Sequence, residues 1–138
     1  MSPDDNKTVV LRYFEEVHNQ RKLTVMDEIF TPDLGESTKK AIAMIVTAFP
    51  DYHISIKDQI AEADKVVTVW TISGTHQGEW MSPMGTIAPT GKQVSYTGTT
   101  TVRVTDGKIA EIIGTNHDHL GLLQQMEALP AIAPRPGA

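Results

Sequence analysis

The apolar residues change their spacing near the middle of the chain, and this change constrains the fold more than any other feature. Before about residue 50 they recur three and four positions apart, as at Val10, Phe14 and Val17, which is the pattern of a helix with one buried face. Beyond that point they alternate with polar residues, as at Ile54 and Ile56, or form β-branched runs typical of strands. Helices followed by consecutive strands predict an α+β fold, with the helices on one face of a curved antiparallel sheet.

Start and stop signals divide the first half into three predicted helices. The first begins at Ser2, an N-cap residue followed by proline, and ends at Asn19. A short second helix is predicted over residues 23–30, with "TPDLG" as its end. The third is predicted over residues 36–49, because its apolar residues share one face and Pro50 follows it.

The second half contains four predicted strands and one long connection. The strands are expected at residues 54–60, 66–76, 93–104 and 108–118. The connection "QGEWMSPMGTIAPTGK" (77–92) holds two prolines and three glycines, and connections of this length often act as lids. Its apolar residues, such as Trp80, indicate a lid or a subunit contact rather than a solvated linker.

The bulk composition excludes several classes of function. A chain of 138 residues is expected to form a single domain, here 1–129, followed by a Pro-rich tail at 130–138. The net charge of −5 offers no basic face for nucleic acid, and the absence of cysteine excludes disulfides and thiol catalysis. Since the N-terminus has neither a basic leader nor a long apolar run, we expect no membrane segment and a cytoplasmic location.

The last predicted hairpin, around "VTDGK", has two possible registers that decide which way Asp118 points. The even positions of strand 93–104 are the more apolar set, so they are expected to face the core. Only a three-residue loop with Gly107 in the left-handed conformation aligns them with the even positions of the next strand. This register predicts that Asp118 and Asn116 point into the core and that His117 points away.

The segment "HDH" (117–119) could be a metal site, an acid–base site or a solvated strand end. In an extended strand His117 and His119 lie on the face opposite Asp118, and two histidines alone make a poor metal site. We therefore expect no metal and two surface histidines. An inward carboxylate is costly unless it is used, so Asp118 is predicted as an acid–base group, as an N-cap for the helix that follows, or as both.

Three stretches together resemble the SnoaL-like polyketide cyclases of the nuclear transport factor 2-like superfamily: "AFPDYHISIKDQIAEADKVVTVWTISGTHQGEW", "PTGKQVSYTGTTTVRVTDGKIAEI" and "DHLGLLQQM". The resemblance runs from about residue 7 to 129 and implies a cone-shaped α+β barrel. It also implies cofactor-independent cyclisation, in which an aspartate near the end of the last strand closes a polyketide ester by an aldol reaction. That aspartate matches Asp118, while Asn19 and His76 match an asparagine ending the first helix and the histidine of "GTH".

The same resemblance leaves other functions open. Relatives in the superfamily isomerise ketosteroids, open epoxides or hydroxylate aromatic polyketides without a cofactor, and a non-catalytic ligand-binding dimerisation module is a further alternative. Two features depart from the family pattern. The segment "TPDLGESTKK" (31–40) is shorter than the family's loop and lacks its histidine, and Thr100 stands where characterised cyclases tend to have a histidine.

The predicted site is a hydrophobic pocket whose walls raise the pKa of Asp118 by desolvation and whose donors hold an enolate oxygen. We expect a hydrophobic small molecule of the keto-ester type as substrate, no cofactor, and a homodimer or homotetramer. The predicted catalytic residues are Asp118, Asn116 and His76. The predicted substrate-binding residues are Tyr13, Phe14, Asn19, Trp70, Trp80, Tyr96, Thr100, Val102 and Ile112.

Overall fold

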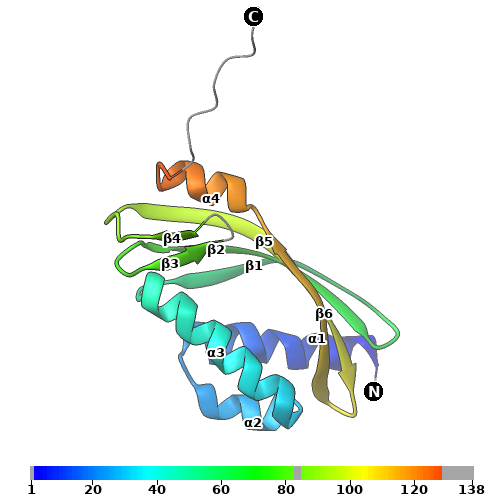
Figure 1. Cartoon of the computed structure of the whole chain (residues 1–138). Helices are drawn as coiled ribbons and strands as arrows, with labels where there is room; N and C mark the ends of the chain where they lie inside the picture. Colours follow the sequence, from blue (N-terminus) through cyan, green and yellow to red (C-terminus); the bar gives the residue numbers. More distant parts are fainter. Residues whose placement is uncertain (1, 83–84, 129–138) are drawn as a thin grey trace, which may run out of the picture.

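A four-stranded antiparallel sheet forms the frame of the computed structural model, which describes residues 2–82 and 85–128 (Figure 1). Its strand order is β1-β2-β5-β6, with β1 at His53–Glu62, β2 at Lys65–Thr75, β5 at Gln93–Thr105 and β6 at Lys108–His117. The connection between β2 and β5 contains a small separate sheet of β3 (Trp80–Ser82) and β4 (Gly85–Ile87). The Pro-rich tail predicted at 130–138 lies outside the described residues.

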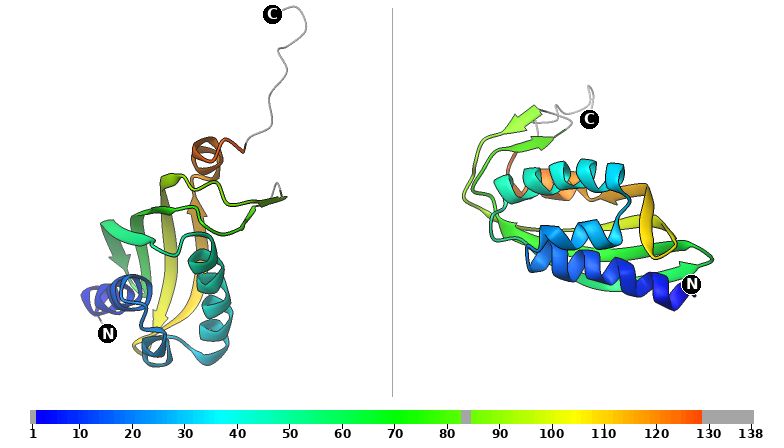
Figure 2. Two further views of the ribbon diagram at one scale, coloured as in Figure 1. Left: turned by 90° about the vertical axis from the view of Figure 1, so that its left-hand side faces the viewer. Right: turned by 90° about the horizontal axis from the view of Figure 1, so that it is seen from below.

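The helices of the first half lie against the concave face of this sheet (Figures 1 and 2). In chain order they are α1 (Pro3–Arg12), the π-helical segment η1 (Tyr13–Asn19), the 3₁₀ turn η2 (Leu23–Val25), α2 (Met26–Ile29) and α3 (Pro32–Ala48). The last helix, α4 (His119–Gln125), follows β6 and lies at the end of the sheet. The predicted α+β fold is therefore confirmed. Within the described part of the chain, no helix combines the length and apolar character needed to cross a bilayer.

The third helix begins earlier than its apolar pattern predicts. Thr31 has the extended backbone of an N-cap residue, and Pro32 occupies the first helical position, where its missing N–H is not needed. "TPDLG" is therefore the start of α3 and not the end of the preceding helix, so the prediction of a loop at 31–40 was wrong. As a consequence α3 is a long helix that can form one whole wall of the interior.

The first helix widens into a π-helix over its last two turns. Gln20 donates its backbone N–H to the carbonyl of Glu15, five residues earlier. The wider turn places Tyr13, Phe14 and His18 together on the buried side. π-Helical insertions of this kind are frequent at functional sites.

The β5–β6 hairpin has a different register from the predicted one. Its turn consists of two residues, Asp106 and Gly107, with φ angles of 50° and 78°, as in a type I′ turn. Two residues of β6, Ala110 and Ile113, have no partner on β5, and each such bulge inverts the alternation of the strand. The predicted three-residue loop was therefore wrong.

Beyond the second bulge, the odd positions of β6 face the core. Thr115 pairs with Thr100 and His117 pairs with Gly98, so Thr115 and His117 lie on the concave face. Asn116 and Asp118 are exposed. The predicted orientation of these residues was wrong because the turn has two residues instead of three. The two bulges each invert the alternation, so their effects cancel by the end of the strand.

The opposite face of the sheet carries partly exposed β-branched residues. Val67, Val69 and Thr71 alternate along β2 with buried neighbours and are only partly covered. The homodimer or homotetramer stays a prediction.

Candidate active site

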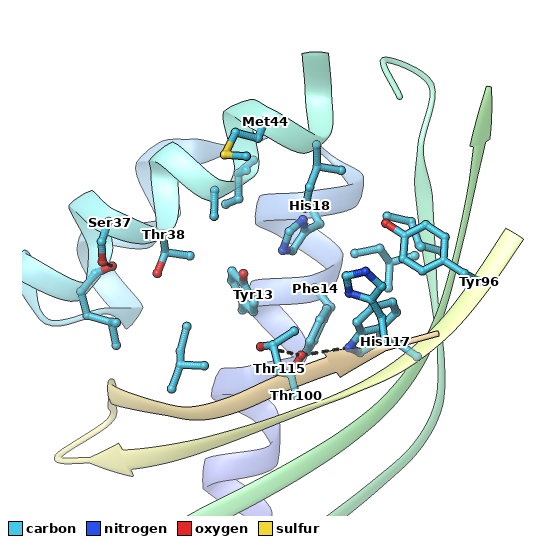
Figure 3. A pocket seen from close by; sticks show the side chains of 18 of the residues that line it. Tyr13, Phe14, His18, Ser37, Thr38, Met44, Tyr96, Thr100, Thr115 and His117 are labelled. Carbon is cyan, nitrogen blue, oxygen red and sulfur yellow. Dashed lines mark hydrogen bonds between the residues drawn. The ribbon is translucent and has the colours of Figure 1, made fainter. Parts of the chain in front are cut away.

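An apolar cavity of about 430 Å³ lies between the N-terminal helices and the concave face of the sheet (Figure 3). Seven of the predicted substrate-binding residues line it: Tyr13, Phe14, Trp70, Trp80, Tyr96, Thr100 and Ile112. Its remaining lining residues were not predicted: His18, Leu34, Ser37, Thr38, Ala41, Ile42, Met44, Ile45, Ile54, Ile72, Thr115 and His117. No Asp, Glu, Lys or Arg is among these described residues of the lining, so the cavity wall carries no permanent charge.

The cavity opens between α3 and the end of β6. Ser37, Ala41 and Met44 lie on α3, line the cavity and are exposed, and Thr115 on β6 is exposed opposite them. Figure 3 shows Ser37 and Met44 on the helix across the cavity from Thr115. A ligand would therefore enter beside α3, the helix whose start the sequence pattern missed.

The connection between β2 and β5 contributes Trp80 to the cavity wall, and its role as a lid or a subunit contact stays a prediction. Trp80 is 7% exposed and lines the cavity, with its ring centroid 5.4 Å from that of Phe49. At the base of the connection His76 is fully buried, and its Nδ1 accepts a hydrogen bond from the backbone N–H of Thr90 at 3.2 Å. His76 does not line the cavity, so its position is that of an anchor for this connection.

His117 is the titratable group of β6 that lines the cavity. Its Nε2 lies 3.1 Å from Nδ1 of His119, and its ring centroid lies 5.1 Å from that of Tyr96. Burial, assisted by His119, lowers the pKa of His117 to about 4, while the nearby charge of Asp118 acts in the opposite direction. The imidazole of His117 is therefore neutral at pH 7 and able to accept a proton.

A second histidine, His18, lines the helical side of the cavity. It is 3% exposed, and its Nδ1 lies 2.9 Å from the hydroxyl oxygen of Tyr52. Burial lowers the pKa of His18 to about 3, and the positive charge of Arg21 adds to the effect. Its place on the apolar stripe, four residues after Phe14, was a sequence signal that could have identified it.

The neutral state of His18 makes the stability of the protein depend on pH. Since the folded chain does not protonate His18 until about pH 3 and the unfolded chain does so near 6.5, the unfolded state binds the extra proton between these values. The contribution to the free energy of unfolding is complete above pH 6.5 and should fall by about 2 kcal/mol between pH 7 and pH 5. Urea unfolding at pH 7 and pH 5 should show a smaller decrease in the free energy of unfolding for His18→Gln than for wild type. The control His53→Gln, a change at an exposed site, should show the same decrease as wild type. An unchanged fall in His18→Gln would contradict the assignment.

Asp118 is the N-cap of α4. Its Oδ1 accepts the backbone N–H of Gly121 at 2.9 Å, and its side chain is exposed and does not line the cavity. A side chain at Gly121 would meet the carboxylate, since an added Cβ would lie 2.2 Å from Oδ2. The predicted capping role is confirmed, whereas the inward orientation of the carboxylate was wrong.

The cap can be tested separately from any catalytic role. Asp118→Ala should lower the free energy of unfolding by about 1 kcal/mol, because the backbone N–H of Gly121 loses its acceptor. Asp118→Asn should leave stability nearly unchanged, because asparagine is an equally good N-cap. Urea denaturation measures the free energy of unfolding of the two variants. Equal values for Asp118→Ala and Asp118→Asn would show that the capping hydrogen bond to Gly121 does not stabilise the protein.

Thr100 lines the cavity with its hydroxyl group held by two neighbours. Its Oγ1 accepts the indole N–H of Trp70 at 2.9 Å and lies 3.5 Å from the hydroxyl oxygen of Thr115 (Figure 3). Both contacts use Thr100 as an acceptor, so within the described residues its own O–H remains available. Thr100 can therefore donate a hydrogen bond to an oxygen atom of a ligand.

The other predicted site residues lie outside the cavity. The amide of Asn19 donates to the carbonyl and accepts from the N–H of Ile54, both at 2.8 Å, and so ties the end of η1 to β1. Val102 is 1% exposed and belongs to the core, and Asn116 is exposed on the outer face. Across residues 2–82 and 85–128, no three His, Asp or Glu side chains lie together as metal ligands.

A curved antiparallel sheet that encloses an apolar cavity beneath N-terminal helices defines the nuclear transport factor 2-like fold. Within that class, the chain belongs to the SnoaL-like polyketide cyclase family, whose model matches residues 8–126. Members of this family bind small hydrophobic ligands, and membership supports a cyclase or a related function.

Solved structures agree with this classification. AclR from Streptomyces galilaeus, a proposed hydroxylase, is 26% identical, with a TM-score of 0.79 over 96% of this chain and 91% of its own. A proposed SnoaL-like polyketide cyclase from Jannaschia sp. CCS1 is 23% identical, with a TM-score of 0.81 over 94% of this chain and 98% of its own. TsrD from Streptomyces laurentii is 21% identical, with a TM-score of 0.82 over 94% of this chain and 99% of its own. The last two show the fold alone, and no curated protein matches the chain.

Proposed function

We propose that the protein catalyses cofactor-independent acid–base chemistry, of the intramolecular aldol type, on a neutral hydrophobic keto-ester. The observation that carries this proposal is a neutral histidine, His117, in the wall of an apolar cavity. An aldol closure needs a base that removes a proton next to a carbonyl group and later returns a proton to the new alkoxide. A neutral imidazole can do both steps.

The cavity selects the charge of its ligand. Because the described lining carries no cation and no carboxylate, a free acid would enter without a partner for its charge. Burying an unpaired charge costs far more than burying an ester group. The lining therefore supports a ligand that carries an ester group over one that carries the corresponding carboxylate.

His117 and Thr100 have complementary roles in this proposal. His117 accepts the proton, and the free O–H of Thr100 donates to the enolate oxygen. The two residues face the same side of the sheet, two positions apart along the paired strands, or roughly 7 Å by strand rise. The aromatic walls formed by Tyr13, Phe14 and Trp70 hold the rest of the ligand, so that positioning adds to acid–base catalysis.

Two other functions remain as alternatives, each favoured by one observation. The similarity to AclR favours a cofactor-free hydroxylase, or an isomerase, in the same cavity. The exposure of Asp118, the aspartate that the family resemblance matches to the catalytic position, favours a ligand-binding module without turnover. The hydroxylase and the ligand-binding module each make a different prediction in the experiment below.

Deuterium exchange into 2-tetralone, a neutral bicyclic ketone with an acidic C–H group, tests the proposal without knowledge of the natural substrate. The wild-type protein should accelerate exchange at C1 in D2O, as followed by proton NMR. Ala41→Trp should remove this acceleration by filling the cavity mouth, whereas Ala43→Trp, an exposed site outside the lining, should retain it. Binding of 2-tetralone without exchange would support the ligand-binding module instead, and oxygen uptake with anthrone would support the hydroxylase.

A further inference from the structure

We propose that His117 and His119 form a two-histidine relay that carries protons between the cavity and the protein surface. The relay deepens the proposed function and rests on it, because it requires His117 to take a proton from a ligand. The sequence pattern did not indicate such a pair, since the predicted three-residue loop would have directed both histidines to the surface.

The two rings are placed for direct transfer. Nε2 of His117 lies 3.1 Å from Nδ1 of His119, and the ring centroids lie 3.7 Å apart. His117 lines the cavity, whereas His119 is the first residue of α4 and is partly exposed. The pair therefore spans the distance from the cavity wall to the solvent side of the helix.

The contacts of α4 hold His119 in this position. The backbone N–H of Asp118 donates to the carbonyl of Thr97 at 3.0 Å, which continues the β5–β6 pairing by one step. Farther along, the side-chain amide of Gln125 donates to the carbonyl of Ser95 and its oxygen accepts the N–H of Ser95, both at 2.7 Å. The helix is thereby fixed to β5 at both of its ends.

A lone His117 would be a poor proton carrier. A positive charge on it would sit in an apolar wall beside Tyr96 and Trp80, whose ring centroids lie 5.1 and 6.4 Å away. Passing the proton to His119, which is partly exposed, moves that charge toward water. Tyr96 stays neutral throughout, because burial raises its pKa.

The transfer balances in protons and electrons. Nδ1 of His117, which has no hydrogen-bond partner within the described residues, accepts the proton from the ligand C–H, and the C–H electron pair stays on the ligand as an enolate. The N–H at Nε2 of His117 then passes its proton to Nδ1 of His119, and Nε2 of His119 releases a proton to water. The reverse path returns a proton to the alkoxide or enolate.

Two substitutions of His119 separate a relay from a purely structural role. Asparagine can still accept the hydrogen bond from His117 but cannot pass a proton onward, whereas alanine removes both properties. Both His119→Asn and His119→Ala should lower kcat for 2-tetralone exchange by about tenfold or more, within the range of general acid–base effects, with KM unchanged. Added imidazole should restore part of the rate of His119→Ala. A normal rate in His119→Asn would overturn the relay.

A second readout distinguishes failure of the relay from failure of the proposed function. If wild type does not accelerate exchange, the proposed function fails, and the pair is then judged from the ¹⁵N chemical shifts of its ring nitrogens at a pH where both rings are neutral. The relay requires a proton on Nε2 of His117 and none on Nδ1 of His119, because the first nitrogen donates to the second. A wild-type protein in which Nδ1 of His119 carries the proton would overturn the relay, whatever the exchange rates.

Discussion

His117→Gln is expected to lower the rate of 2-tetralone exchange by about 10²- to 10⁴-fold, the usual contribution of a general acid–base group. Glutamine is similar in reach and can keep a hydrogen bond to His119, but it does not titrate. The cavity wall should remain intact, because His117 is only partly buried and lies near the end of β6. The measurement is the initial rate of deuterium incorporation, with 2-tetralone binding followed separately to show that the cavity still accepts the ligand.

Asp118→Asn is the matched control for this prediction. It changes the neighbouring residue, keeps the N-cap of α4 and removes only a charge outside the cavity, so its exchange rate should stay within about threefold of wild type. The opposite pattern, with activity lost in Asp118→Asn and kept in His117→Gln, would identify Asp118 as the base, as the family resemblance implies.

Trp70→Ala is expected to cause the largest loss of stability, about 3–5 kcal/mol, because it removes a large buried side chain and leaves a cavity. Trp70 is 6% exposed, and its ring lies against the backbone of β5, where an added Cβ at Gly98 would approach the ring to 2.6 Å. Its indole N–H also holds the hydroxyl of Thr100. Urea denaturation followed by far-UV circular dichroism should show the loss as a lower transition midpoint.

Trp70→Phe separates packing from hydrogen bonding at this position. Phenylalanine keeps most of the ring volume but has no N–H to donate to Thr100. The missing hydrogen bond should lower the free energy of unfolding by about 1 kcal/mol, in addition to the effect of the smaller ring. A loss in Trp70→Phe as large as that in Trp70→Ala would show that the hydrogen bond, and not the packing, dominates. The same variant should weaken the 2-tetralone exchange, because Thr100 is then no longer oriented.

The order of helices and strands could be predicted because each segment carries its own periodicity. The long β-branched run became β2, and the helical stripe became α1 and η1. The start of α3 was missed because Pro32 was taken as a helix stop, although proline after a threonine is equally a start signal. Proline can thus mark either the end of one helix or the start of the next, and only the packing of the following turns decides between the two.

The active-site residues were harder to predict because they depend on register. The length of the β5–β6 turn decides whether His117 or Asp118 faces the cavity, because the two bulges of β6 cancel in their effect on the alternation. The sequence "VTDGK" is compatible with both turn lengths. The consecutive apolar residues Ile112 and Ile113 were the one local sign of an interruption, with Ile113 turned out to solvent. Trp70 and Tyr96 line the cavity as the alternation predicted, because they lie on β2 and β5, where the register is regular throughout.

The most direct test of His117 as the acid–base group is an ¹⁵N NMR titration of its imidazole, assigned by comparison with His117→Gln and repeated with 2-tetralone. If His117 lies in the apolar wall as described, its pKa is about 4 in the free protein and its ring signals move when 2-tetralone binds. A pKa at or above the ordinary value of 6.5, with ring signals that 2-tetralone leaves unchanged, would contradict that role.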